Sequence, residues 1–447
     1  MQLPNYPITQ LPIPNIPNPH PSTSGSLLSP AAQDAITQLP NYPITQLPIP
    51  NIPNPHPSTS GSLRSPAAQD AIPNPNPNPN PYPYPYPYPY PYPYPYPYPQ
   101  SPMPLRSPVT VIVLVLLLYL AAVLASNDGD PLAFVRIGTR YSRNDPAGSQ
   151  GYDGQFVYYI ARHPAPRTVA GMLDNPPYRY QRILLPLLAR GLSFGNPAAL
   201  PWVLVAIGVI SHAAGTWVVA RLLAGYNVSR WYALVYGLWP GFLLAVRLDL
   251  PEPLAYALIG AAILIEKPRP WLGWVLYGLA AFAKEVALLF VAAQLLVYLR
   301  ERRLREAAGL FGVGVLPFLV FQGWLWVVFG RLGIGSGGAM ATGFEIVPFM
   351  GLLRVGAFSL GLLAVFALVY VPSVYFPALW GVWVSARRWL RGQTGLANAA
   401  LLVNGLVIPF LPFSTVREPG GMFRFVGGWC WRCCCMLAAT GEGACCD

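Results

Sequence analysis

Long apolar runs separated by short polar joins dominate the chain between residues 108 and 428. The first run extends from Val109 to Ala125, and a long polar connection at 126–182 follows it. Further runs lie near 198–223, 231–246, 252–265, 271–283, 286–299, 307–329, 360–386 and 396–413, and another begins at Phe425. Several approach or exceed the roughly 20 residues that a helix needs to cross a bilayer. Because a membrane barrel shows alternating segments of about 10 residues instead, the pattern predicts an all-α transmembrane helix bundle with about nine or ten spans.

The overall composition agrees with a membrane protein. The 447 residues carry a formal net charge of +11, and only 10% are charged while 53% are hydrophobic. Soluble domains average about 25% charged residues, so the composition argues against a water-soluble enzyme. The mean hydropathy of +0.39 points the same way. No nucleic-acid-binding module is recognisable, and the basic joins between apolar runs account for the positive charge.

The first 107 residues have a different, repetitive composition. They hold 32 of the 54 prolines, and residues 2–36 recur as 38–72 with one difference, Leu28 against Arg64. Frequent proline blocks helices and central strands, so 1–107 is expected to be a disordered or polyproline-II-like arm. A stalk or a ligand for aromatic grooves is one interpretation. We favour translated DNA repeats upstream of a start at Met103.

The last residues also depart from the rest. All six cysteines follow Trp429, namely Cys430, Cys433, Cys434, Cys435, Cys445 and Cys446. The spacing of Cys430 and Cys433 is typical of metal sites, but no histidine or second spaced pair accompanies it. We expect 429–447 to be the product of a shifted reading frame, with an unstructured tail or a metal site as alternatives. The membrane domain is therefore assigned to 108–428.

The positions of basic residues predict the topology, because cytoplasmic joins are rich in Lys and Arg. Four joins are basic, and they contain Arg221 and Arg230, then Lys267 and Arg269, then Arg300, Arg302, Arg303 and Arg305, and finally Arg387, Arg388 and Arg391. All four lie on one side only if Lys284-Glu285 is a turn between two short helices. We favour that turn. The N-terminus and the basic joins are then cytoplasmic, and loops 126–182, 247–251, 330–348 and 414–424 face outward.

The first outer loop carries the most informative polar residues. The sequence Gly-Tyr-Asp-Gly-Gln-Phe at 151–156 places Asp153 at the start of a short interfacial helix. An N-cap or turn role is the alternative. Asp174 opens a second polar stretch in which Arg179 and Arg182 precede the return to the membrane at Ile183. Guanidinium groups at a membrane face suit an anionic lipid head group, whereas an ordinary helix entry is the alternative.

Three motifs together resemble a known class of membrane proteins. They are the sequence at 151–156, Tyr-Arg-Tyr-Gln-Arg-Ile-Leu-Leu-Pro-Leu-Leu at 178–188, and Ala-Lys-Glu at 283–285. Their combination is similar to bacterial polytopic proteins of the GT-C class of glycosyltransferases, which includes members assigned to cell-surface glycopolymer formation. The likeness covers about 108–428.

The resemblance implies a reaction and assigns roles to residues. GT-C enzymes transfer a sugar from a polyprenyl-phosphate donor with inversion on the outer face, and an acid in the first outer loop is the general base. Asp153 occupies that position, with Gln155 in a supporting role. Asp174 would be a second acid or would orient the arginines. Arg179 and Arg182 would stabilise charge on the departing phosphate. Arg424 lies in a late outer loop, which in GT-C proteins contacts the donor.

Ionisable residues inside apolar runs give further candidates, because such groups are costly in a membrane and usually functional. Lys284 and Glu285 follow only about 13 apolar residues, too few to cross the hydrocarbon core. Adjacent helical residues diverge, so Lys284 is expected to face a phosphate while Glu285 holds it or reaches another helix. A charged re-entrant turn is the alternative. For Arg247, Asp249 and Glu252 we favour a solvated outer turn, with a functional role on the same outer side as the alternative. The glycine-rich 330–338 is expected to be a flexible loop over a lipid site.

The sequence therefore favours an integral-membrane glycosyltransferase that acts on a glycan or lipid acceptor at the outer face of a bacterial cytoplasmic membrane. A transporter or flippase for a lipid-linked or anionic solute is the second interpretation, although 108–428 shows no internal repeat of the kind typical of transporters. A defective membrane protein is the third. No metal-ligand set and no certain cofactor is predicted, and a divalent metal remains an open question.

Overall fold

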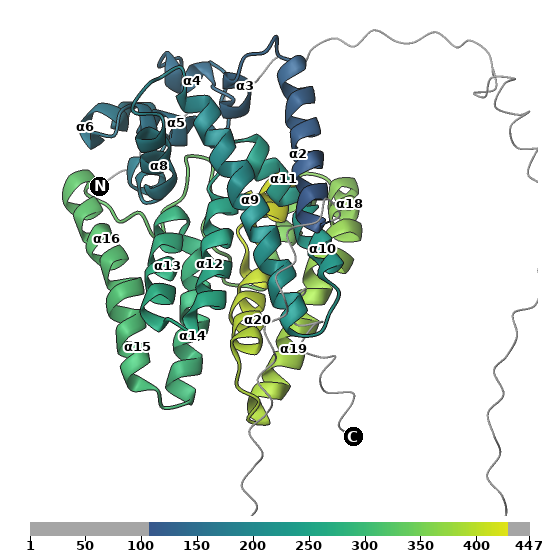
Figure 1. The fold of residues 1–447 in the computed structure, drawn as a ribbon. Coiled ribbons are helices and arrows are strands. Elements are labelled where there is room, and N and C mark those ends of the chain that lie inside the picture. Colours follow the sequence, from purple (N-terminus) through teal and green to yellow (C-terminus); the bar gives the residue numbers. More distant parts are fainter. Residues whose placement is uncertain (1–106, 428–447) are drawn as a thin grey trace, which may run out of the picture. The chain divides into compact units, whose positions relative to one another are not determined.

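The structure, a computed structural model, describes residues 107–427, and every regular element in that range is a helix (Figure 1). This confirms the predicted all-α class. The predictions for the proline-rich arm, for a start at Met103 and for the cysteine-rich tail concern residues outside the described range.

Within residues 107–427, four helices are long and apolar enough to cross a membrane. They are α2 (Pro108–Ala125), α9 (Leu200–Gly225), the continuous helix Leu304–Phe329 and the continuous helix Leu360–Leu390. Shorter helices pack among them, namely α12 (Glu252–Glu266), α13 (Pro270–Ala283), α14 (Leu288–Arg300) and α20 (Leu396–Val407). The chain thus has the architecture of a helical membrane protein, and the count of nine or ten spans stays a prediction.

Helix α9 lies inside this group, whereas the other three long helices lie at its edge. In α9, 61% of the most apolar stretch is buried, against 22% in each of the others. Its neighbours are α2, α10 (Ala233–Gly237), α11 (Pro240–Arg247) and α12. The three long helices at the edge expose large apolar side chains. The exposed fractions of Leu118, Val327 and Leu368 are 71%, 82% and 76%. Surfaces of this kind are stable against lipid tails and not against water.

Proline accounts for the irregular turns in two of the long helices. The first consists of α15 (Leu304–Leu310), the π-helical turn η4 (Phe311–Val315) and α16 (Leu316–Phe329); the second of α18 (Leu360–Tyr370), the π-helical turn η6 (Val371–Tyr375) and α19 (Phe376–Leu390). Each π-helical turn ends two residues before a proline, Pro317 or Pro377. Proline has no N–H to donate and its ring collides with the preceding turn. The wider turn relieves that collision without ending the helix.

The predicted run 231–246 is not one span. It contains α10 and α11, and the break falls at Trp239, whose ψ of 120° is extended because Pro240 follows it. Several short elements complete the description, namely η2 (Arg230–Tyr232), α17 (Met350–Leu353), η5 (Arg354–Ala357), η7 (Ile408–Phe410) and α21 (Phe413–Val416), and residues 419–427 are helical.

The connection between α2 and α9, which includes the predicted outer loop 126–182, folds into small helices. They are α3 (Leu132–Val135), α4 (Thr139–Ser142), α5 (Gly154–Arg162), α6 (Pro166–Val169), η1 (Ala170–Met172), α7 (Pro176–Tyr180) and α8 (Leu184–Leu192). The helix predicted after Asp153 is α5. It packs against α8 and α9 through buried residues such as Phe156, Ile160 and Leu204. The loop is therefore fixed on the bundle, and this gives its polar residues defined positions.

The predicted break at Lys284-Glu285 is confirmed. Helix α13 ends at Ala283, Lys284 is extended with φ −155° and ψ 128°, and the short 3-10 turn η3 (Glu285–Ala287) leads into α14. The turn reverses the chain, so the basic joins α12–α13 and α14–α15 lie at the same end, where Tyr298 donates to Glu266. Figure 1 shows the joins α14–α15 and α19–α20 at the end opposite α3, α4 and α5.

We expect Gly278→Leu to destabilise the fold. Helix α13 meets η4 so closely here that a Cβ on Gly278 would lie 3.1 Å from the Val313 carbonyl and 3.3 Å from the Gly314 Cα. Forcing a side chain into such a contact typically costs about 1–3 kcal/mol. Thermal denaturation in detergent should show a lower melting temperature for this variant. The matched control is Gly323→Leu in α16, where a Cβ meets nothing within 4 Å; equal melting temperatures for the two variants would contradict the expectation.

Candidate functional site

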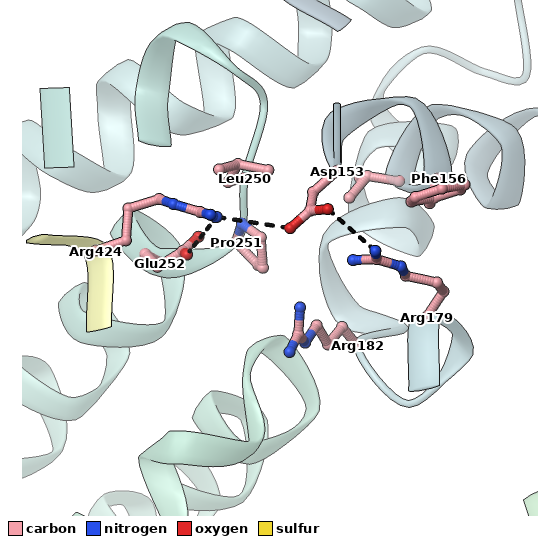
Figure 2. A pocket seen from close by; sticks show the side chains of 9 residues that line it. Asp153, Phe156, Arg179, Arg182, Leu250, Pro251, Glu252 and Arg424 are labelled. Carbon is pink, nitrogen blue, oxygen red and sulfur yellow. Dashed lines mark hydrogen bonds and ion pairs between the residues drawn. The ribbon is translucent and has the colours of Figure 1, made fainter. Parts of the chain in front are cut away.

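A pocket lies where the connection between α2 and α9 meets the ends of the bundle helices. Its wall contains Asp153, Phe156, Val157, Arg179, Arg182, Leu250, Pro251, Glu252 and Arg424 (Figure 2). These residues come from α5, α7 and the turn after it, the start of α12 and the helical segment 419–427. The pocket combines apolar surface with a concentration of charge. Four of the predicted site residues, Asp153, Arg179, Arg182 and Arg424, lie together in it.

Asp153 stands at the N-cap position of α5, but its side chain makes no capping hydrogen bond. It instead forms ion pairs with two guanidinium groups: Arg179 Nη2 lies 3.0 Å from Oδ1, and Arg424 Nη1 lies 3.7 Å from Oδ2. The side chain is 33% exposed, so its carboxylate is accessible in the pocket. Capping therefore does not explain this residue, although its place at the helix start agrees with the prediction.

The pKa of Asp153 is well below its usual range. Burial alone would raise it, but the positive charges of Arg179, Arg424 and Arg182 outweigh that effect, and the hydrogen bond from Arg179 adds to them. The carboxylate is therefore ionised at every pH near neutrality. Its basicity depends directly on how strongly the arginines hold it.

Asp174 holds Arg179 in place. Arg179 donates from Nε to Asp174 Oδ1 at 2.7 Å and from Nη2 to Oδ2 at 2.9 Å, a bidentate pair in which both side chains are buried. Asp174 does not line the pocket. Of the two roles expected for it, the geometry matches the orientation of an arginine. The guanidinium also stacks 4.3 Å from the centre of the Phe156 ring, which fixes its plane.

The glycine-rich outer loop packs against the same pair. Asp174 Oδ2 accepts from the backbone N–H of Ala339 at 3.0 Å, and the side-chain Nδ2 of Asn175 donates to the Gly337 carbonyl at 2.5 Å. A Cβ on Gly338 would lie 2.8 Å from both Asp174 Oδ2 and Arg179 Nη2, so a larger residue here would have to displace this pair. The loop expected to lie over the site contacts Asp174 and Arg179, at one side of the pocket.

Arg182 and Glu285 form a second, partly buried pair. Arg182 donates to Glu285 from Nη2 to Oε1 at 2.5 Å and from Nε to Oε2 at 2.8 Å, and it also donates to the Tyr178 hydroxyl at 2.6 Å. The pair connects the outer loop with the break between α13 and α14. Glu285 thus reaches another element, as expected, and leaves Lys284 to a different partner.

That partner is Glu252, which the sequence analysis placed in a solvated turn. This interpretation was wrong: Glu252 is 0% exposed and Asp249 is 2% exposed. Lys284 Nζ lies 2.5 Å from Glu252 Oε1, and Arg424 Nη1 lies 3.4 Å from the same oxygen. Lys284 therefore reaches the pocket only through Glu252. The sequence feature that could have indicated this burial is a single acid between Pro251 and Pro253, directly before an apolar run.

Arg424, in the segment 419–427, is hydrogen-bonded to Tyr152, which lies just before α5. Arg424 Nη2 donates to the Tyr152 hydroxyl at 3.0 Å, and that hydroxyl donates to Glu418. Burial raises the pKa of Tyr152 beyond its usual value, and Glu418 and Asp153 add to the effect against the opposing charge of Arg424. Tyr152 and Glu418 were not among the predicted site residues. Nothing in the sequence alone places residues 152 and 418 side by side.

Gln155 has a structural role away from the pocket. Its side chain is buried, accepts from the Gly138 amide at 3.1 Å and donates to the Gln150 carbonyl at 2.7 Å. It ties the segment 138–150 to α5 and so supports Asp153 indirectly.

With regard to metals, residues 107–427 contain no group of three or more His, Cys, Asp or Glu side chains placed to hold an ion.

Comparison of the chain with protein-family models, with curated proteins and with solved structures gives no match. The site must therefore be interpreted from its own geometry: four cations, Arg179, Arg182, Lys284 and Arg424, interleaved with four carboxylates, Asp153, Asp174, Glu252 and Glu285. This arrangement can bind an anion through its arginines and can remove a proton through Asp153.

We expect strong coupling between Arg179 and Asp174. Breaking a buried pair by removing one partner typically costs about 3–5 kcal/mol, because the other charge stays buried without compensation. Arg179→Gln and Asp174→Asn should each lower the melting temperature in detergent, and the double variant should lose much less than the sum. The exposed pair Arg303–Glu306 is the control, since such pairs contribute only about 0–1 kcal/mol. If the losses in melting temperature of the two single variants added up in the double variant, Arg179 and Asp174 would not be a coupled pair.

Proposed function

We propose that this chain is a membrane glycosyltransferase that transfers a sugar from a polyprenyl-phosphate donor to a glycan or lipid acceptor, with inversion. The observation that carries the proposal is the Asp153 carboxylate, partly exposed in a pocket whose wall contains three arginines. A base beside a group of cations at the end of a membrane bundle suits a reaction in which a hydroxyl loses a proton while a lipid phosphate departs. The resemblance of the three motifs to GT-C enzymes agrees with it.

Asp153 is the proposed general base. The acceptor hydroxyl attacks the anomeric carbon, Asp153 takes its proton, and the bond between that carbon and the phosphate oxygen breaks with the electrons passing to the phosphate. One attack from the face opposite the leaving group inverts the configuration. Asp153 is the only carboxylate among the pocket-lining residues that is not fully buried.

The proposed phosphate ligands are Arg179, Arg182 and Arg424. All three line the pocket, and guanidinium groups suit phosphate because they present paired N–H donors. They stabilise the charge that develops on the departing phosphate. Lys284 contributes through Glu252, because that carboxylate lies between it and the pocket.

Donor binding would also activate the base. In the structure the arginines hold the pKa of Asp153 low, which makes its carboxylate a weak base. A phosphate that accepts hydrogen bonds from Arg182 and Arg424 competes with Asp153 for the same positive charge. The pKa of Asp153 would then rise towards its ordinary value when the donor is bound, and its basicity would increase at the moment the acceptor requires it.

The proposed orientation places the pocket outside the cytoplasmic membrane of a bacterium. The basic joins lie at the end of the bundle opposite the pocket, and basic joins favour the cytoplasm. A transporter remains the alternative. Transport sites lie near the bilayer midplane between discontinuous helices, whereas most of this charge lies on the outer loop and at helix ends.

We expect Asp153→Asn to abolish transfer. Membranes containing the full chain would be supplied with a panel of labelled polyprenyl-phosphate sugars, and transfer to endogenous acceptors would be measured. Removing a general base typically costs about 10²–10⁴-fold in rate, while the amide preserves the size of the side chain. Asp128→Asn, an exposed position in the same loop, should transfer at the normal rate. Equal transfer by Asp153→Asn and the native chain would remove Asp153 from the mechanism, and no transfer with any donor would favour transport.

The acid side of the pH profile provides a separate check. A group with a lowered pKa is deprotonated over a wider range, so Asp153 in the free enzyme stays ionised down to acidic pH. We expect kcat/KM, which reports the free enzyme, to stay level as the pH falls from about 8 to about 5. In Arg179→Gln the pKa of Asp153 rises, and the acid limb should move to higher pH. The role of Asp153 as general base would be contradicted if the acid limb of the native chain lay near neutral pH and stayed at the same pH in Arg179→Gln.

A further inference from the structure

One pocket-lining carboxylate, Glu252, has no direct contact with the proton or the phosphate in the reaction as proposed. Glu252 is the first residue of α12, lies between two prolines and is 0% exposed. Its neighbours Leu250 and Pro251 also line the pocket. Figure 2 shows the guanidinium end of Arg424 between the carboxylates of Glu252 and Asp153. Glu252 therefore lies beside the space that the substrate would enter.

The two oxygens of Glu252 differ in their surroundings. Oε1 accepts from both Lys284 and Arg424. Oε2 is buried and has no hydrogen-bond partner within residues 107–427. A buried oxygen without a partner is costly, at about 1–3 kcal/mol and more for a charged group. Such groups are uncommon in native structures and call for a specific explanation.

The chemistry of the pocket indicates what would satisfy Oε2. A phosphate diester has no proton to donate, and the arginines already provide its partners. A hydroxyl does donate, and a carboxylate is its strongest ordinary acceptor. The remaining wall contains Phe156, Val157, Leu250 and Pro251, which suits the C–H face of a sugar ring. An anionic acceptor next to an apolar surface thus fits a polyhydroxyl group better than it fits a phosphate.

We propose that Glu252 is a specificity residue whose Oε2 accepts a hydrogen bond from one hydroxyl of the sugar on the lipid phosphate. Lys284 and Arg424 fix the orientation of the carboxylate through Oε1 and leave Oε2 for the ligand. The inference rests on the proposed function, because it supplies the sugar-binding part of the same pocket. It assigns recognition of the phosphate to the arginines and recognition of the sugar to Glu252.

The test compares two lipids by binding rather than turnover. The full chain in detergent is titrated with farnesyl phosphate, which has no sugar, and with farnesyl phosphate sugars, and affinity is read from the shift in melting temperature. In Glu252→Gln we expect affinity for one sugar lipid to fall by about tenfold or more, while affinity for farnesyl phosphate is unchanged or rises. A matched donor lacking the contacted hydroxyl should bind the native chain and Glu252→Gln equally.

Two further variants separate this contact from a general effect of charge. Glu418→Gln removes a carboxylate that faces the same Arg424 at 3.6 Å but does not line the pocket, and it should leave the preference between the two lipids unchanged. Glu252→Asp keeps the negative charge near Lys284 and Arg424 but draws both carboxylate oxygens back, so it should lose affinity for the sugar lipid while its melting temperature falls less than that of Glu252→Gln.

The outcomes are distinct. Equal losses for both lipids in Glu252→Gln, or no loss for either, would overturn the sugar contact while leaving the proposed function in place. A native chain that binds neither lipid would overturn the proposed function, and the sugar contact with it.

Discussion

Buried charges must be paired, and this constraint organises the end of the bundle that carries the pocket. A chain of alternating charges runs from Asp174 through Arg179, Asp153, Arg424 and Glu252 to Lys284. Its members come from the first outer loop, the start of α12, the break after α13 and the segment 419–427. An unpaired ion in such surroundings would be expensive. The pairs therefore bring together segments that are more than 200 residues apart in sequence, and they place cations around one accessible carboxylate.

The pairs differ in strength, and this difference matters for function. Arg179 and Arg182 are held by short, bidentate contacts with Asp174 and Glu285. Arg424 makes longer ion pairs, 3.4 Å to Glu252 and 3.7 Å to Asp153, besides its hydrogen bond to Tyr152. Short bidentate pairs fix a guanidinium in position, whereas longer contacts leave donor capacity for a ligand. The site thus combines two firmly positioned arginines with one that is better placed to respond when an anion enters.

The surrounding fold meets the opposite demand, because its peripheral helices expose many large apolar side chains. The outer helices expose leucine, valine and tryptophan side chains, and proline-induced π-helical turns keep two of them continuous. Close approaches at glycine, such as Gly278 on η4 and Gly154 on the Leu248 carbonyl, let helices and loops pack tightly. The approach at Gly154 fixes the start of α5 against the turn before α12, so it also sets the distance between Asp153 and Glu252.

The sequence by itself determined the features that depend on local pattern: the all-helical class, the long apolar helices, the break at Lys284 and the helix that begins after Asp153. Hydrophobic run length and charge spacing suffice for these, because they act within one segment. Only the tertiary structure decided which charges meet. Glu252 and Asp249 are buried, although the sequence suggested a solvated turn. The Gln155 side chain is hydrogen-bonded to the backbone of its own loop. Tyr152 contacts Glu418 and Arg424. Pairing depends on packing between distant segments, and no local pattern encodes it.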